Sequence, residues 1–380
     1  MALIERYNKN PILSADYKSS FENHSVFNGC PIQDKEKIKL VYRAIAADQE
    51  IHGKKLNVSS IGYAESSDGI NFKKRKQLIS PKEEWECFGC EDPRITKING
   101  KYFIFYTALS KYPFCAEGIK VGVAVTKDFK KIEKHPVTCF NSKAMTLFPE
   151  KINGKLAALL SVHTDCPPTK TCIAFFDKEE DIWSPEYWSK WYHSLYDHIL
   201  PIEKGSKHLV EIGAPPIKTK HGWLIIYANI RNYYSGDQKV FGIDATLLDL
   251  KDPTKIIGSI EDPLLIPTED YEINGKVPNV VFPAGALVKN DDLYIYYGAA
   301  DTSTCLAKVS LKNLLKDLLE KRLVSFERYS KNPILEPSSR NAWESKAVFN
   351  PAAIYLDQKS HIVYRAMSQD DTSVLGYASS

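Results

Sequence analysis

The sequence lacks long hydrophobic runs and a strong net charge. The stretch Val277–Val288 is about half of the ~20 residues that a membrane span needs, and it contains two prolines. Residues Met1–Asn10 hold no apolar segment of the kind a secretory signal requires. The 50 Lys and Arg against 47 Asp and Glu leave a charge of +3, and Lys73–Lys76 is typical of a solvated turn. We therefore expect neither a membrane nor a nucleic-acid partner.

Several catalytic and metal-binding motifs are also missing. There is no Gly-rich phosphate loop, no Gly-x-Ser-x-Gly turn and no His-Glu-x-x-His. The eight cysteines are scattered, which favours reduced thiols and a cytoplasmic location. Cys87 and Cys90 have zinc spacing but no second pair, and His193 and His198 lie among aromatic residues, so we expect no metal and no bound cofactor.

What the chain does have is many short strand patterns. Its 43% hydrophobic and 11% aromatic residues exclude disorder, and 380 residues suit two domains or one large repeat architecture. Runs of β-branched and aromatic residues of strand length occur at Ile38–Tyr42, Tyr102–Tyr106, Val121–Val125, Trp223–Tyr227 and Leu293–Tyr297. Turn signals such as Asn-Gly recur with aromatic strands every 50 to 70 residues, about the length of a four-stranded blade. The pattern favours an all-β fold, a β-propeller rather than a β-sandwich.

One segment has a different period. Leucines at 311, 314, 315, 318 and 319 form the stripe of an amphipathic helix, which predicts a C-terminal helix over residues 311–323.

The end of the chain repeats its beginning. Arg6–Leu13 returns as Arg328–Leu335, Val26–Asn28 as Val348–Asn350, and Val41–Ala44 as Val363–Ala366, each 322 positions later. We therefore expect a catalytic domain over residues 1–325 and a partial second copy of its start over residues 326–380.

The segment Gly89–Arg94 is the strongest candidate for chemistry. Glu91 and Asp92 are followed by a proline and Arg94 immediately before a strand, and loop carboxylates on a rigid scaffold suit acid chemistry and sugar binding. The same Glu-Asp-Pro tripeptide at Glu261–Pro263 reads only as a turn.

Ordered motifs along the chain resemble glycoside hydrolase family 130, which consists of five-bladed propellers that act on β-mannosides as phosphorylases or hydrolases. The matching segments are Asn10–Leu13, Tyr42–Ala44, Gly62–Gly69, Glu91–Arg94, Phe148–Ile152, Gly213–Ile217, Leu247–Leu250, Pro278–Pro283 and Tyr297–Thr302. The resemblance implies a short oligosaccharide substrate.

The resemblance also implies roles for individual residues. Asp92 matches the general acid, whose proton reaches the glycosidic oxygen through a mannose hydroxyl. Residues in motifs that line the −1 sugar pocket are Asn28, Arg43, Glu91, Lys151 and Asp301. Two of these have structural alternatives, since Arg43 suits an ion pair and Lys151 an exposed turn.

The phosphate ligands of such phosphorylases look depleted. The expected histidine falls at Ala228, an arginine at Ser161 and a tyrosine at Phe241, while a second arginine is replaced by Lys120. A phosphate dianion needs such cations and donors. The sequence thus favours hydrolysis.

Inverting hydrolysis needs a carboxylate to activate water. Glu211, just before the Gly213–Ile217 motif, is the candidate base, with a surface acid as its structural alternative and Glu150 as second choice. We expect a β-mannoside hydrolase. The alternatives are a phosphorylase or mannosyltransferase that uses Lys120 and Arg231, and a non-catalytic sugar-binding propeller.

Overall fold

The computed structural model describes residues 3–51, 53–202, 204–205, 207–320 and 329–380. The chain divides into two compact units, Met1–Lys321 and Arg322–Ser380. The expected boundary at residues 325/326, Leu323 of the expected helix and Arg328 of the repeat all lie outside the described residues.

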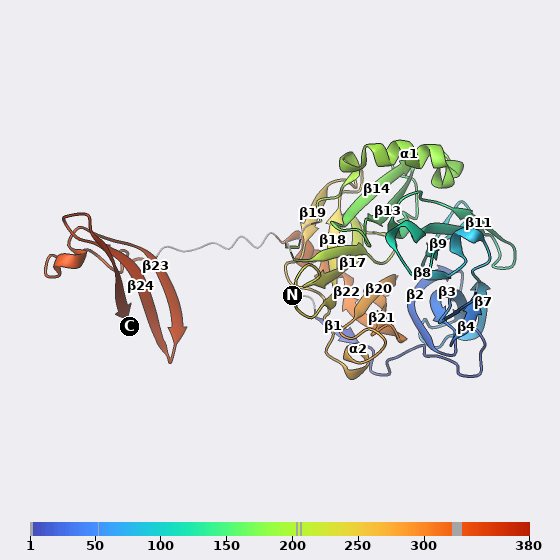
Figure 1. Cartoon of the computed structure of the whole chain (residues 1–380), viewed down its shortest axis with the longest axis horizontal. Coiled ribbons are helices and arrows are strands. Elements are labelled where there is room, and N and C mark those ends of the chain that lie inside the picture. The colour runs from blue at the N-terminus through green and yellow to red at the C-terminus, as the bar shows by residue number, and fades with distance from the viewer. Residues whose placement is uncertain (1–2, 52, 203, 206, 321–328) are drawn as a thin grey trace. The chain divides into compact units, whose positions relative to one another are not determined.

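Antiparallel sheet dominates the first unit (Figure 1), whose described strands form sheets of eight, three, five and four strands. A parallel pair, Ser59 with Gly89, links the two halves of the eight-stranded sheet. We divide that sheet at this pair and number the five resulting strand groups in chain order. The first strand group contains β2 (Ser25–Asp34), β3 (Lys37–Ile45), β6 (Ser59–Ser66) and β7 (Lys73–Ile79). The second contains β8 (Gly89–Ile98), β9 (Lys101–Leu109), β10 (Ile119–Thr126) and β11 (Ile132–Pro136). The third contains β12 (Ser142–Leu147), β13 (Leu156–Val162) and β14 (Lys170–Phe176).

The fourth and fifth strand groups complete the unit. The fourth contains β15 (Leu209–Ile212), β16 (Ile217–Lys218), β17 (Trp223–Arg231), β18 (Val240–Leu248) and β19 (Ile256–Ser259). The fifth contains β20 (Val281–Lys289), β21 (Asp292–Ala299), β22 (Ser303–Ser310) and β1 (Ile4–Arg6). Because β1 comes from the start of the chain and pairs with β22, Ile4 opposite Val309, the first and last strands of the unit are joined. A hairpin of β4 (Gln49–Ile51) and β5 (Lys54–Leu56) stands apart.

These strands confirm the mostly-β prediction. All five predicted strand segments lie within strands: β3, β9, β10, β17 and β21. Helices are few: α1 (Pro185–His193), α2 (Asp270–Ile273), α3 (Leu311–Leu319) and the 3₁₀ turns η1 (Glu84–Glu86), η2 (Ala116–Gly118), η3 (Glu179–Trp183), η4 (Leu195–His198) and η5 (Ala342–Glu344).

Helix α3 carries the predicted leucine stripe but ends at Leu319, within the expected range. Leu314, Leu315 and Leu318 are buried against the fifth and fourth strand groups, and Ser310 caps the helix by accepting a hydrogen bond from the Asn313 N–H at 3.4 Å.

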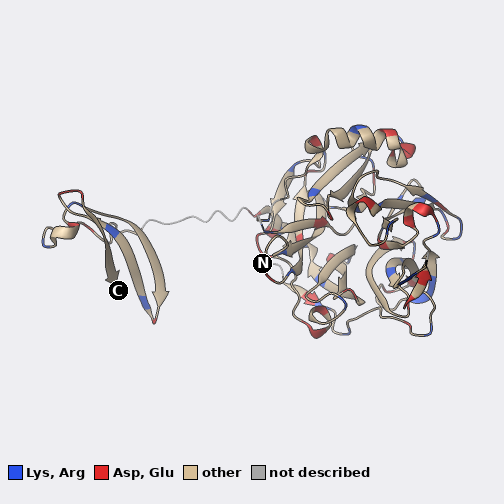
Figure 2. Ribbon diagram, viewed as in Figure 1, with Lys and Arg blue, Asp and Glu red and all other residues tan. Residues whose placement is uncertain are grey.

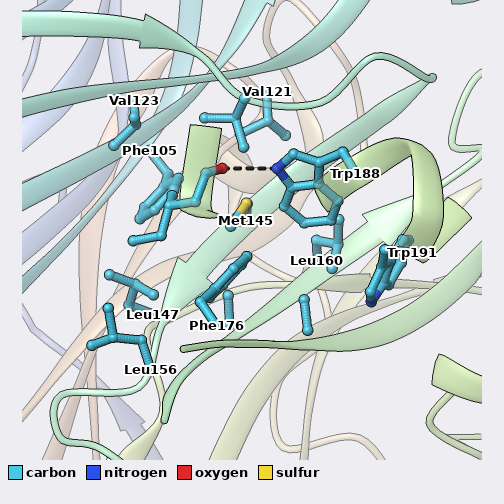
Figure 3. Packing of buried hydrophobic residues seen from close by; sticks show 14 of the residues in the cluster. Phe105, Val121, Val123, Met145, Leu147, Leu156, Leu160, Phe176, Trp188 and Trp191 are labelled. Atoms are coloured by element: carbon cyan, nitrogen blue, oxygen red, sulfur yellow. Dashed lines mark hydrogen bonds between the residues drawn. The ribbon is translucent and has the colours of Figure 1, made fainter. Parts of the chain in front are cut away.

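Aromatic packing fills the space between the second and third strand groups (Figure 3). Phe105, Val121, Met145 and Leu160 contribute side chains from both groups, and helix α1 covers them with Trp188. The Trp188 indole N–H donates to the Ile182 carbonyl at 2.8 Å, so this buried ring leaves no donor unpaired.

The second unit is a three-stranded sheet of β23 (Ala347–Leu356), β24 (Lys359–Met367) and β25 (Ser373–Ser379). Its strands correspond to β2, β3 and β6 of the first strand group. Basic and acidic residues are interspersed along both units (Figure 2), in line with the small net charge. No helix in the described parts of the chain is long and apolar enough to cross a membrane.

Candidate active site

Two β-bulges turn candidate residues out of the regular sheet. The pairing of β2 with β3 shifts between Phe27 and Cys30, and Asn28 has φ 52°. The pairing of β8 with β9 shifts between Glu91 and Arg94, and Asp92 has φ 50°. Bulges re-aim side chains and occur next to active sites, and Asn and Asp tolerate positive φ better than most residues. The two bulges bring Asn28 and Asp92 together from separate strand groups.

The Asp92 carboxylate is the centre of a cluster of charged and polar side chains. Its Oδ1 accepts a hydrogen bond from Asn28 Nδ2 at 2.7 Å and lies 3.4 Å from an Arg43 guanidinium nitrogen. Burial works to raise the pKa of Asp92, but the charges of Arg43 and Arg94 and the amide of Asn28 outweigh it, and the pKa lies below its ordinary value. The free site therefore favours ionised Asp92.

Arg43 holds both acids of the motif. Its guanidinium forms a hydrogen-bonded ion pair with Glu91, and its Nε donates to Ser59 Oγ at 3.1 Å. The Ser59 hydroxyl in turn donates to Glu91 Oε1 at 3.0 Å. Arg43 thus forms the ion pair that was its structural alternative, but the acids it pairs with are themselves candidate site residues.

Glycine at 298 makes room for Asn28. A Cβ added to Gly298 of β21 would lie 2.0 Å from Asn28 Oδ1, so no other residue fits there without a shift of the Asn28 side chain.

Arg94 joins the second strand group to the fourth. It is 1% exposed, and it donates to the carbonyls of Ile212 and Gly213 at 2.9 Å each and to that of Asp92 at 2.7 Å. These bonds fix the chain immediately after Glu211 against the Asp92 bulge.

Glu211 of β15 consequently lies within the electrostatic reach of Asp92. Burial raises its pKa, the positive charges of Lys143 and Arg94 oppose the shift, and the negative charges of Asp92 and Asp165 add to it. In the free protein the pKa of Glu211 is raised and that of Asp92 is lowered.

Asp301 reaches the cluster from the turn between β21 and β22, where it has φ 52°. Burial raises its pKa to about 6, against the charge of Arg43 and with the charges of Asp92 and Glu91. Lys276 lies near the same residues. Its charge lowers the pKa of Asp301, and the charges of Arg43 and Glu91 act in turn on the pKa of Lys276. Lys276 was not among the residues predicted from the sequence.

Lys143 is the second residue that sequence reasoning missed. It precedes the bulge of β12, where the pairing with β13 shifts and Ala144 has φ 54°. This is the position that Glu91 has before the bulge of β8. Aligning the strand groups by their bulges would have found it, whereas no motif in the chain marks it.

Two predicted residues lie apart from this cluster. Lys151 is exposed on the turn after β12, and no interaction within the described residues joins it to Asp92 or Glu211. Glu150, the second choice for the base, forms an exposed ion pair with Lys218. The structure thus brings together Asn28, Arg43, Glu91, Asp92, Glu211 and Asp301 but not Lys151.

All eight cysteines are free thiols, and burial raises the pKa of Cys87 and Cys90. Among the described residues no group of three or more His, Cys, Asp or Glu is placed to hold a metal ion.

Comparison with known proteins identifies the family. Residues 4–321 match the glycoside hydrolase 130 family, described as beta-1,4-mannooligosaccharide phosphorylase. The chain belongs to glycoside hydrolase family 130. The resemblance inferred from the motifs is thereby confirmed.

Two relatives from family 130 are similar over almost their whole length. A 1,2-beta-oligomannan phosphorylase of Thermoanaerobacter sp. is 36% identical over 83% of this chain and 99% of the relative. A beta-1,2-mannobiose phosphorylase of the same organism is 35% identical over 81% of this chain and 98% of its own length. The structure of the Listeria innocua beta-1,2-mannobiose phosphorylase in complex with β-1,2-mannobiose superimposes with a TM-score of 0.67, at 27% identity, over 83% of this chain and 99% of that one.

Proposed function

We propose that this chain cleaves the β-mannosidic bonds of short mannosides with inversion, with Asp92 as the proton donor. The arrangement of Asn28, Arg43 and Asp92 supports the proposal most directly, because two hydrogen-bond donors from the first strand group converge on one partly buried carboxylate of the second. We further propose that the five strand groups are the blades of a propeller and that this cluster lies at its centre. The joining of β1 to β22 and the ring of strand groups in Figure 1 support that arrangement.

We propose water as the first candidate nucleophile. Glu211 takes a proton from water as its oxygen bonds to the anomeric carbon, the glycosidic C–O bond breaks, and Asp92 delivers a proton to the leaving oxygen through a mannose hydroxyl. The two carboxyls hold one proton in the active form. The active form carries this proton on Asp92. Because the free site favours ionised Asp92 and raises the pKa of Glu211, the active form is the less populated of the two singly protonated forms. The ratio kcat/KM therefore follows the macroscopic pKa values of the pair.

Phosphate is the second candidate nucleophile, and the relatives favour it over water, because the curated relatives are named phosphorylases. In that reaction a phosphate oxygen bonds to the anomeric carbon, the glycosidic C–O bond breaks, and the leaving sugar oxygen takes the same proton from Asp92, which gives mannose 1-phosphate and a shortened sugar. The anion ligands suggested for it, Lys120 and Arg231, are not among the described groups that act most strongly on Asp92 or Glu211.

Product analysis separates the candidates. Purified protein is incubated with β-1,2- and β-1,4-mannobiose, with and without inorganic phosphate, and the products are separated by chromatography. Mannose at equal rates under both conditions establishes hydrolysis. Mannose 1-phosphate that forms only with phosphate establishes phosphorolysis, and binding of both sugars without any product would leave a sugar-binding protein.

A further inference from the structure

Two cations act on Glu211, and both already have partners. Arg94 gives its hydrogen bonds to three carbonyl groups. Lys143 forms an ion pair with Asp165, with 2.7 Å between Lys143 Nζ and Asp165 Oδ1. The hydrogen-bond donors of Arg94 are thus taken up by carbonyl groups, and the charge of Lys143 is paired with that of Asp165.

The Lys143–Asp165 pair is held in a fixed place. Asp165 Oδ2 accepts hydrogen bonds from Asn141 Nδ2 at 2.9 Å and from the Thr164 hydroxyl at 2.8 Å. The Asp165 backbone N–H donates to Asn141 Oδ1 at 3.0 Å. With both oxygens bonded, Asp165 is oriented toward Lys143 rather than free to turn into solvent.

This pairing bears on which nucleophile can enter. A phosphate dianion needs uncompensated cations or several donors, and it would meet the carboxylates of Glu211 and Asp92 here. Water carries no charge and needs only Glu211 as an acceptor. Lys143 supplies the strongest positive charge acting on Glu211, so its partner decides whether that charge is available.

We propose that Asp165 selects the nucleophile: by binding Lys143 in an ion pair beside Glu211, it keeps phosphate out and leaves the position to water. This inference rests on the proposed cleavage of β-mannosides. Asp165 acts through Lys143 and does not touch the substrate.

Asp165→Asn tests the proposal in the full chain. Asparagine keeps an oxygen for Asn141 and Thr164 but leaves the Lys143 charge uncompensated. The ratio of mannose 1-phosphate to mannose, formed from β-1,2-mannobiose in inorganic phosphate, is expected to rise about tenfold or more. Asp252→Asn is the matched control, because Asp252 pairs with Lys255 on an exposed turn outside the site. Lys143→Met added to Asp165→Asn is expected to abolish the gain.

Phosphate binding gives a readout that does not need turnover. The rise in melting temperature with inorganic phosphate is expected to be larger for Asp165→Asn than for the wild type and for Asp252→Asn. An unchanged product ratio overturns the proposal, and so does an unchanged phosphate effect on melting if the variant is inactive. If the wild type cleaves no mannoside, the proposed function is wrong, and the melting experiment still tests the role of Asp165.

Discussion

The first strand group and the second unit have nearly the same local structure but different surroundings. Tyr42 donates to Glu22 at 2.7 Å, and its counterpart Tyr364 donates to Glu344 at 2.8 Å. Asn28 and Asn350 have φ 52° and 51° at matching bulges.

The matching arginines extend the comparison. The Arg43 and Arg365 guanidinium groups each lie 4.9 Å from a phenylalanine ring, and each Nε donates to a serine hydroxyl at 3.1 Å. Arg43, however, is mostly buried against Glu91 and Asp92, whereas Arg365 and Asn350 are exposed. The difference shows that the local sequence forms the strands, bulge and hydrogen bonds, while the charged cluster requires the second and fifth strand groups.

Replacing Asp92 gives the largest expected effect on activity, because Asp92 is the proposed proton donor and has no counterpart among the described residues of the second unit. Asp92→Asn keeps the size of the side chain and an acceptor for Asn28 but removes the proposed proton donor. We expect cleavage of β-1,2-mannobiose to fall about 10³-fold, measured as kcat/KM. Melting within a few degrees of the wild type would show that the variant is folded, and full turnover by it would refute the assignment.

Arg43 and Arg365 make a matched pair for the comparison. Arg43→Ala removes the partner of two acids, and we expect kcat/KM to fall about 10²-fold. Arg365→Ala deletes the same contacts to phenylalanine and serine in the second unit, and kcat/KM should not change. Equal losses in the two variants would mean that the second unit takes part in the site.

Tyr42 and Tyr364 test the part of the structure that is local. Replacing either by phenylalanine leaves a buried carboxylate without its hydroxyl donor, at a cost of about 1–3 kcal/mol in the free energy of unfolding. Amide hydrogen exchange should show each loss confined to its own unit. A loss of protection that spreads into the other unit would contradict the division into two units.

Asp301 gives the smallest effect, and it depends on pH. Its pKa is raised to about 6 in the folded protein from an ordinary 3.8, so the folded state binds more protons than the unfolded state between these values. The contribution of Asp301 to stability is present below about pH 4 and is lost as the pH rises through 6. Asp301→Asn should therefore raise the free energy of unfolding at pH 7 and have little effect at pH 4. The expected gain is about 1–2 kcal/mol, less than the full pKa shift corresponds to, because Asp301 is only partly buried.

The exposed Asp371 of the second unit is the control, since it pairs with Lys346 at the surface. Asp371→Asn removes a surface carboxyl outside the site and is measured under the same conditions. A constant difference between Asp301→Asn and the wild type from pH 4 to pH 7 would show that the carboxyl does not titrate in this range.

Much of the fold and part of the site could be predicted from the sequence. Strand runs such as Tyr102–Tyr106 and the leucine stripe of α3 are local patterns, and the Asp92 motif is contiguous. Lys143 and Lys276 were missed because their importance comes from contacts between strand groups far apart in the chain. Lys151 was included because it lies in a recognisable motif, yet its turn exposes it to solvent.

The opposite pKa shifts of Asp92 and Glu211 could not be read from the sequence either. They depend on Arg94, which is held by the carbonyls after Glu211, and on Lys143 from a third strand group. Charge balance in a site assembled from several strand groups is a property of the folded molecule.

The anomer released first from β-1,2-mannobiose tests inverting cleavage at this site most directly. Proton NMR spectra recorded during the first turnovers, before mannose mutarotates, would identify it, with Asp92→Asn as the comparison. Inverting hydrolysis predicts that the α-anomer appears first, as free mannose without added phosphate, and that Asp92→Asn releases none on the same timescale. Release of the β-anomer first, or unchanged release by Asp92→Asn, would contradict it.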